Sequence, residues 1–119
     1  MKFIIKREEL LPALQIVNGV IERRQTLPIL SNLLLSAKKN SLTLSGTDIE
    51  VELITTRNQD VATEGEATLP ARKLLDICRA LPEDAEIILS VNGDKAQVTS
   101  GKSRFTLSTL PAQEYPIVE

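Results

Sequence analysis

The sequence repeats one helical pattern after 64 residues, and this repeat constrains the fold more than any other feature of the chain. In each half, four apolar side chains recur at the three- and four-residue spacing of a helix that buries one face. They are Leu10, Leu11, Leu14 and Val17 in the first half, and Leu74, Leu75, Cys78 and Leu81 in the second. We therefore expect two similar helices in two similar surroundings.

The segments that flank the two helices repeat as well. Before each helix, apolar residues alternate in the same phase: Phe3 and Ile5, then Ala67 and Leu69. After each helix, an apolar run leads to a Ser-Gly pair that we predict to be a turn before an alternating strand. The two pairs, Ser45-Gly46 and Ser100-Gly101, are 55 residues apart, so the first half carries about nine extra residues, which we assign to residues 22–30.

The pattern predicts an α+β fold built from two strand-helix-three-strand units, with the two helices packed on one side of antiparallel sheets. The expected strands are 2–6, 30–37, 41–46, 49–57, 62–69, 86–91, 95–100 and 103–109, and the expected helices are 7–19 and 70–81. Pro82 should stop the second helix, and Asn92-Gly93 indicates a hairpin. Such a fold would present a curved surface suited to a long ligand.

Length and composition favour one globular domain in a reducing compartment. The chain has 119 residues, 42% of them hydrophobic, which is enough for one compact core. The single cysteine, Cys78, excludes an intrachain disulfide, and no apolar run is long enough to span a membrane. We expect a cytoplasmic protein. Pro111 and Pro116 predict an extended tail, so residues 111–119 are interpreted as the start of a linker in a longer protein.

The residues offer little for catalysis, and we predict that the chain is not an enzyme and needs no cofactor or metal. Histidine is absent, which excludes histidine-based acid–base chemistry within these residues. Cys78 lies on the apolar stripe and should pack as a small hydrophobic side chain. Asp48 and Glu50 could hold a metal ion, but alternating acids beside a turn are more often a solvated strand face.

The charges are unevenly distributed although the net charge is only −2. Arg23 and Arg24 fall in the loop after the first helix. Arg72 and Arg79 lie almost in line on the outer face of the second helix, with Asp76 between them. This arrangement is either an ordinary solvated face or a cationic face that meets phosphates of a duplex backbone. The outer face of the first helix has Glu8, Pro12 and Gln15 instead.

The last predicted strand also allows two interpretations. Phe105 and Leu107 point to one side, and Lys102, Arg104 and Thr106 point to the other. The two apolar side chains could simply belong to the core. If the strand forms a sheet edge, however, its backbone can pair with another chain, and its basic residues become half of an ion-paired interface.

Five stretches together resemble the N-terminal domain of the bacterial DNA polymerase III beta subunit, the beta sliding clamp family. They cover almost the whole chain in order, and together they are highly specific. They are Met1-Lys2-Phe3 with Arg7-Glu8; Thr26-Leu27-Pro28-Ile29-Leu30 with Asn32-Leu33-Leu34-Leu35; Leu44-Ser45-Gly46-Thr47-Asp48; Pro70-Ala71-Arg72-Lys73 with Asp76-Ile77-Cys78-Arg79; and Ser100-Gly101-Lys102-Ser103-Arg104-Phe105 with Leu107-Ser108-Thr109-Leu110-Pro111.

The resemblance implies a single DNA-clamp domain over residues 1–119, the first of three in a subunit. Two subunits of this family close head to tail into a ring around duplex DNA, with helices lining the pore. The ring is a processivity factor that tethers the polymerase, and an ATP-driven clamp loader places it on DNA. The implied DNA-binding residues are Arg24, Arg72, Arg79 and Gln15. Relatives often carry a lysine where this chain has Pro12.

The resemblance also implies a role for the last strand in the homodimer interface. Phe105 and Leu107, with Ile77 beside them, match its apolar centre, and the basic rim is formed by Lys73, Lys95, Lys102 and Arg104. The alternative is a stand-alone adaptor domain of the same fold that binds protein partners through the edge strand at 102–108.

Overall fold

The computed structural model describes residues 1–21, 28–47, 52–59 and 61–116. The first unit contains β1 (Lys2–Lys6), α1 (Arg7–Asn18), β2 (Asn32–Lys38), β3 (Ser41–Thr47) and β4 (Glu52–Asn58). The second contains β6 (Gly65–Pro70), α2 (Ala71–Ala80), β7 (Glu86–Asn92), β8 (Lys95–Ser100) and β9 (Ser103–Ser108). The strand-helix-three-strand order predicted for both halves is therefore confirmed. A short strand, β5 (Val61–Thr63), joins the two units.

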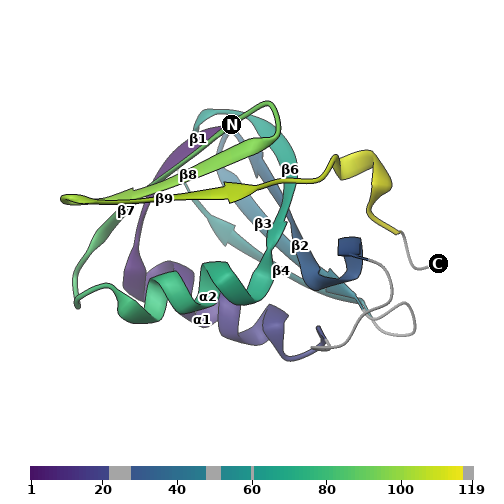
Figure 1. Cartoon of the computed structure of the whole chain (residues 1–119), viewed down its shortest axis with the longest axis horizontal. Coiled ribbons are helices and arrows are strands. Elements are labelled where there is room, and N and C mark those ends of the chain that lie inside the picture. Colours follow the sequence, from purple (N-terminus) through teal and green to yellow (C-terminus); the bar gives the residue numbers. More distant parts are fainter. Residues whose placement is uncertain (22–27, 48–51, 60, 117–119) are drawn as a thin grey trace.

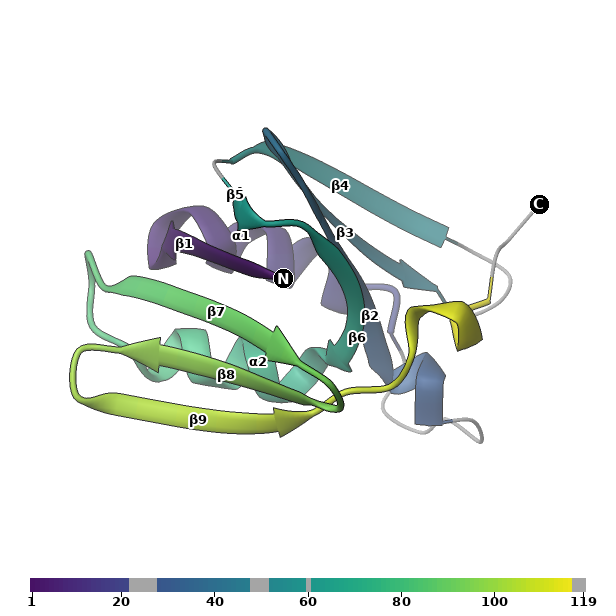
Figure 2. The same cartoon turned by 90° about the horizontal axis from the view of Figure 1, so that it is seen from above.

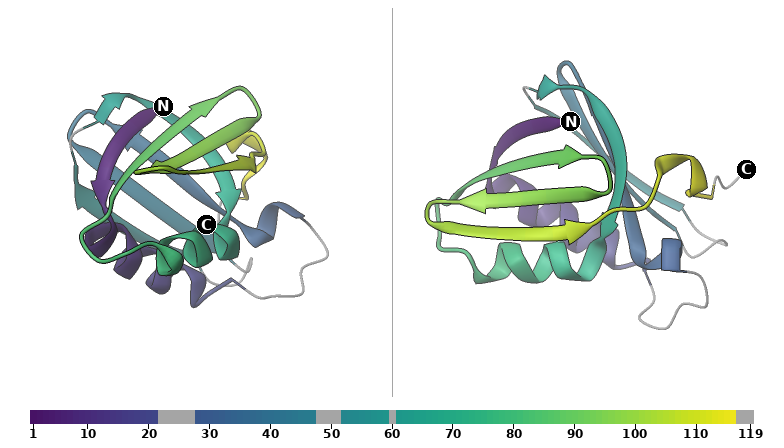
Figure 3. Two further views of the ribbon diagram at one scale, coloured as in Figure 1. Left: turned by 60° about the vertical axis from the view of Figure 1, so that its left-hand side comes forward. Right: turned by 45° about the horizontal axis from the view of Figure 1, so that its top comes forward.

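The two helices lie next to each other on one side of the molecule, as predicted (Figure 1). Contacts at both ends show that they run antiparallel: the first residue of α1 contacts the C-terminal end of α2, and its last residue contacts the N-terminal end. The Arg7 side-chain Nε donates to the backbone oxygen of Cys78 at 2.8 Å. At the other end, the Asn18 amide donates to the backbone oxygen of Ala71 at 3.3 Å. Further views show the strands arching over this helical layer (Figure 3).

The two units exchange their first strands, which the sequence pattern did not predict. One sheet has the order β5-β1-β7-β8-β9, and the other has the order β4-β3-β2-β6. β1 of the first unit therefore pairs with β7 of the second, and β6 of the second pairs with β2 of the first. Figure 2 shows β6 lying against β2 while the β7–β9 meander forms the other sheet. Because of this exchange, neither unit has a complete sheet of its own.

Each unit ends in a segment that turns back onto its own first strand. In the first unit, Gln59 N–H donates to Asn40 O at 3.1 Å, and Val61 of β5 pairs with Phe3 of β1. In the second, Thr109 N–H donates to Asp94 O at 2.9 Å, and Leu110 pairs with Thr68 of β6. The internal repeat therefore extends beyond the three strands that the sequence indicated.

The single strand expected at 62–69 is two strands in different sheets, β5 and β6, so that prediction was wrong in this respect. The chain crosses between the sheets at Glu64 and Gly65. Gly65 lies against Met1, where an added Cβ would come within 3.0 Å of the Met1 Cβ. A residue without a side chain allows this close crossing.

The predicted apolar stripes form the core. Leu10, Leu14 and Val17 of α1 are fully buried, and Leu11 is half-buried. In the second unit, Leu74 and Cys78 are fully buried, and Leu75 and Leu81 nearly so. They pack with inward-facing residues of both sheets, including Phe3, Leu33, Leu69 and Leu89, in one cluster. Burial of these side chains is the main stabilising contribution to the domain.

The Ser45-Gly46 turn was predicted wrongly, because Gly46 lies inside β3. A Cβ at Gly46 would lie 2.8 Å from Cγ1 of Val17 and 3.2 Å from Cγ2 of Val20. Gly46 is therefore required for the close approach of the end of α1 to the sheet. Gly101, in contrast, has a φ of +57° and lies in the β8–β9 turn, as predicted. Ser41 pairs with the last residue of β2, and Lys95 pairs with the last residue of β7, so the two residues occupy equivalent positions in the two units. Counted along β3 and β8 from these positions, Gly46 of the first unit corresponds to Ser100 of the second.

The segment after β9 packs against the domain instead of forming the expected extended tail. Ala112–Glu114 form a short 3₁₀ helix, η2, as do Pro28–Ser31 (η1) before β2. Tyr115 is buried, and its hydroxyl donates to Ser45 O at 3.1 Å. The Thr68 hydroxyl donates to Leu110 O at 2.9 Å and accepts from the Asn32 amide at 3.0 Å. Residues 109–116 thus form a strap from the edge strand β9 to the other sheet.

Candidate nucleic-acid and subunit interfaces

The exposed face of α2 carries most of the cationic residues predicted to contact DNA. The helix begins at Ala71, directly after Pro70, and its buried stripe leaves Arg72, Lys73, Asp76 and Arg79 exposed. Arg72 Nε lies 3.3 Å from Asp76 Oδ1, and both side chains are more than half exposed. A pair of this kind, one helical turn apart, adds only about 0.3–0.5 kcal/mol and leaves the guanidinium accessible.

The exposed face of α1 has a different character. It carries Glu8, Glu9, Pro12, Gln15 and Ile16. The Glu8 carboxylate accepts the backbone N–H of Asp84 at 2.8 Å and lies 3.5 Å from Arg7 Nη1. The hydrogen bond from Asp84 is the main cause that lowers the pKa of Glu8, and Arg7 contributes further. Glu8 is therefore a fixed negative charge at the N-terminal end of α1.

Gln15 on α1 and Arg72 and Arg79 on α2 are all exposed, and these two helices lie next to each other. Arg24 lies outside the described residues. A guanidinium can donate two hydrogen bonds to one phosphate, whereas the Gln15 amide offers a single uncharged contact. Contacts of this type hold a nucleic-acid backbone and carry no base sequence information.

The second candidate surface is the β9 edge, which we define as Lys102–Ser108. β9 is the last strand of its sheet, so of the two interpretations left open by the sequence the edge position is the one that the structure has. Phe105 is half-buried and Leu107 is buried, whereas Arg104 and Thr106 are exposed. The alternation predicted from the sequence is therefore present. β9 passes along the same side of the molecule as α2 (Figures 1 and 3).

The remaining residues predicted for the interface are spread around the β9 edge. Lys73 projects from the exposed face of α2, and Lys102 lies in the β8–β9 turn. The Lys95 ammonium donates to the Ser108 hydroxyl at 3.1 Å. Ile77, on the same helix as Lys73, is only 9% exposed in the single chain and already packs in the core. The residues thus form an apolar strip with basic neighbours.

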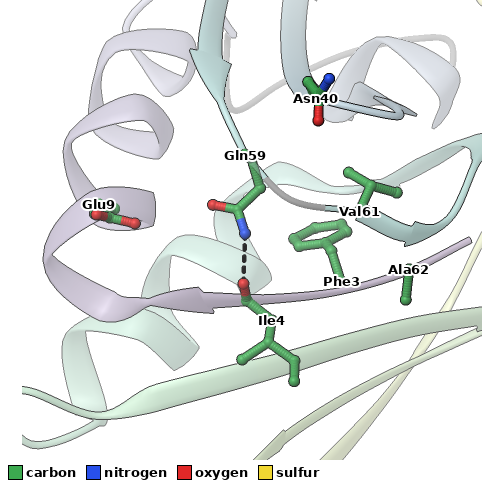
Figure 4. Close-up of a pocket in the computed structure, with 7 residues that line it drawn as sticks. All are labelled: Phe3, Ile4, Glu9, Asn40, Gln59, Val61 and Ala62. Atoms are coloured by element: carbon green, nitrogen blue, oxygen red, sulfur yellow. Dashed lines mark hydrogen bonds between the residues drawn. The ribbon is translucent and has the colours of Figure 1, made fainter.

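A hollow of about 750 Å³ on the opposite edge was not anticipated from the sequence. Figure 4 shows Phe3, Val61 and Ala62 on one side of it and Glu9 on α1. The Gln59 side chain crosses it to donate to the backbone oxygen of Ile4. This contact ties the end of β4 to β1.

The described residues show no arrangement typical of a catalytic or metal centre. No group of three or more acidic, Cys or His side chains that could bind a metal occurs among them. Burial raises the pKa of the Cys78 thiol to about 11, which makes it a poor nucleophile. Likewise, no helix in the described part of the chain is long and apolar enough to cross a membrane.

Comparison with known proteins identifies the fold and the family. Over residues 1–119 the sequence matches the family model of the DNA polymerase III beta subunit, N-terminal domain. The chain belongs to the DNA polymerase III beta subunit family. Its α+β architecture is the DNA-clamp fold, since it superimposes on a crystal structure of the DNA polymerase III subunit beta from Pseudomonas aeruginosa with a TM-score of 0.96.

Relatives in the DNA polymerase III beta subunit family are close but longer. The P. aeruginosa structure is 55% identical and covers 100% of this chain, which corresponds to 32% of that protein. The beta sliding clamp of Pseudomonas putida is 56% identical over 120 residues, 33% of its length. The beta sliding clamp structure from Caulobacter crescentus is 43% identical, with a TM-score of 0.96. The chain thus spans about a third of these relatives.

Proposed function

We propose that the protein containing this chain is a subunit of a sliding clamp, the processivity factor of a replicative DNA polymerase. Two subunits would form a head-to-tail ring around duplex DNA, with this chain as the N-terminal domain of each. The ring would hold DNA polymerase III on its template in the cytoplasm, and a clamp loader would place it there. The observation that carries the proposal is the 56% identity to a beta sliding clamp over the whole chain.

In this proposal the clamp has no active site, and it holds the polymerase on DNA by encircling the duplex. A closed ring stays on DNA because it encircles the duplex, so it does not need tight phosphate contacts. The absence of histidine from the sequence is consistent with a role that needs no general base near neutral pH.

The helical layer is the part of this domain that would face DNA. Arg72 and Arg79 would contact phosphates, and Arg24 and Gln15 would add contacts beside them. Exposed guanidinium groups release counterions when they meet a phosphate backbone, so these contacts should weaken as salt rises. The exposure of Arg72, Arg79 and Gln15 on one layer supports this assignment.

The β9 edge would form the joint with the partner subunit. Phe105 and Leu107 would supply the apolar centre, with Ile77 supporting them from below. Lys73, Lys95, Lys102 and Arg104 would form the basic rim, facing acidic groups of the partner. The open edge of the sheet supports the proposal, because its unpaired backbone groups favour pairing with a further strand. The rim charges would mainly steer and orient the partner.

Topological retention on DNA tests the proposal. The full-length protein is loaded with a clamp loader and ATP onto nicked circular DNA, which is then linearised. We expect retention on circles and rapid loss from linear molecules, because only a ring can slide off an end. Equal retention on both would indicate ordinary binding, and an adaptor domain that uses the β9 edge for other proteins would then be the better explanation.

A further inference from the structure

The internal repeat places opposite charges at equivalent exposed positions of the two helices. With the offset of 64 residues, Glu8 corresponds to Arg72, and Glu9 corresponds to Lys73. Gln15 corresponds to Arg79, and all six of these residues are exposed. The buried positions of α1 and α2 match in character, whereas their exposed positions differ in charge.

The antiparallel packing gives this inversion a definite geometry. α1 and α2 lie side by side (Figure 1), and the exposed charged residues are Arg72, Lys73, Asp76 and Arg79 on α2 but only Glu8 and Glu9 on α1. Packed helices have axes about 8–10 Å apart. The Debye length at physiological salt is about 8 Å, so charges on the two helices act on a nearby duplex with comparable screening.

Glu8 has a backbone hydrogen bond as well as an ion pair. Its carboxylate accepts the backbone N–H of Asp84, in the segment between α2 and β7, and it lies close to Arg7. The Glu8 carboxylate therefore has two partners that hold it at the N-terminal end of α1.

We propose that this domain holds the duplex against α2 and away from α1, and that Glu8 is a positioning residue for the DNA. The inference rests on the proposed function, because it concerns where DNA runs along the helical layer. Phosphates gain attraction near Arg72 and Arg79, whereas the α1 face carries Glu9 and Glu8, the latter paired with Arg7, and offers them no net attraction. Gln15, which is uncharged, offers one neutral hydrogen bond on the α1 side and no electrostatic attraction. A duplex biased toward one helix keeps only part of the layer in contact and slides with fewer phosphate contacts at a time.

Cross-linking from equivalent positions tests the proposal directly. Pro12 and Asp76 correspond to each other in the repeat, are both exposed and lie near the middle of their antiparallel helices, so they stand at the same level along the layer. A photoreactive residue is placed at either position in the full-length protein, which is loaded onto nicked circular DNA and irradiated. The protein with the probe at position 12 also carries Asp76→Asn, so that both proteins have the same net charge. We expect at least threefold more DNA cross-linking from position 76 than from position 12. Equal yields, or a higher yield from position 12, would overturn the proposal.

The Glu8→Gln variant tests the residue. The glutamine oxygen can still accept the Asp84 N–H, so the helix end keeps its contact while the charge is lost. We expect association of the full-length protein with linear duplex to become about twofold tighter at low salt and to converge with wild type at high salt. Glu66→Gln, an equal charge change on exposed β6, should leave association unchanged. Equal effects of both variants, or none from Glu8→Gln, would exclude the positioning role.

The outcomes separate this inference from the function on which it rests. Retention of wild type on circles together with equal cross-linking from positions 12 and 76 overturns the inference alone. Failure of wild type to be retained on circles overturns the proposed function and this inference with it.

Discussion

The two repeat units bury their helices in the same way but differ in the residues that their helices expose. α1 and α2 bury corresponding side chains at Leu10 and Leu74 and at Leu14 and Cys78, all of them fully enclosed. Their outer faces share little, because Glu8 corresponds to Arg72. The comparison teaches that the core fixes the spacing of the buried positions, whereas the exposed positions are free to specialise.

The units also differ in how closely each helix approaches its sheet. In the first unit, Gly46 lets Val17 of α1 lie directly on β3. In the second unit, Ser100 occupies the equivalent position and is half-exposed. The two units therefore share their strand order but differ in how the helix packs on the sheet. Matched substitutions at equivalent positions of the two units can measure these differences.

The largest expected effect comes from the β9 edge, which we propose as the joint with the partner subunit. Phe105→Arg in the full-length protein should bury an unpaired guanidinium at the joint, at a cost on the order of 3–5 kcal/mol. The dimer should dissociate at least tenfold more readily, as measured by sedimentation velocity. Thr106→Arg, on the exposed face of the same strand, should leave the dimer intact. An intact Phe105→Arg dimer would show that the joint lies elsewhere.

The equivalent core positions Leu14 and Cys78 should differ in how much each stabilises the fold. Leu14→Ala leaves a cavity and should lower the free energy of unfolding by about 3 kcal/mol. Cys78→Ala removes one buried atom and should cost only about 1 kcal/mol. Urea unfolding of the 119-residue chain measures both. Equal costs would mean that the two stripes are not packed alike, despite their matching burial.

Gly46→Ala should destabilise the fold more than the matched substitution Ser100→Ala, because the end of α1 lies directly against Gly46. The new Cβ would lie 2.8 Å from Val17 Cγ1 and 3.1 Å from Val17 O, so the helix end must shift. We expect a loss of about 2 kcal/mol in the free energy of unfolding. Ser100→Ala at the equivalent position should change it by less than about 0.5 kcal/mol. A tolerated alanine at Gly46 would contradict the close approach.

The smallest effect should be a loss of stability in alkaline solution, caused by Cys78 of the second unit, which has no counterpart thiol in the first. Burial raises the pKa of Cys78 from 9.0 to about 11, so the thiol ionises more easily in the unfolded chain than in the folded one. Its contribution is fully present below pH 9 and is lost as pH rises toward 11. At pH 10 the free energy of unfolding should be lower by about 1 kcal/mol. In the Cys78→Ala variant, urea unfolding should show no such decrease in the free energy of unfolding at pH 10. An equal decrease in the variant would mean that other groups cause it.

The sequence was most informative where structure depends on local periodicity. Both helices were predicted to within two residues, because their stripes of buried leucine and related side chains follow a 3.6-residue period. The alternation of Phe105 and Leu107 with exposed residues likewise indicated the orientation of β9. The exposed cationic residues of α2 followed from the same helical geometry.

Features that depend on distant partners could not be predicted in the same way. The exchange of β1 and β6 reflects a choice of sheet partner, which alternation alone does not specify. Gly46 was interpreted as a turn because glycine serves both turns and close approaches, and only the position of Val17 decides between them. Tyr115 lay in a segment rich in proline and polar residues that resembled a linker. The charge inversion at Glu8 was visible in the sequence, but only if exposed positions of the repeat are compared as well as buried ones.

The strand exchange has a consequence for how such a domain could arise. A single unit would leave its first strand paired only with the short segment that ends the unit, and two identical units could each supply the other with a full sheet partner by trading that strand. The connectivity is therefore that of a swapped homodimer whose copies have become consecutive segments of one polypeptide. Duplication and fusion of one ancestral gene would reach it without passing through an unpaired intermediate. Once fused, the two copies no longer had to be identical, and one helix could become acidic while the other became basic.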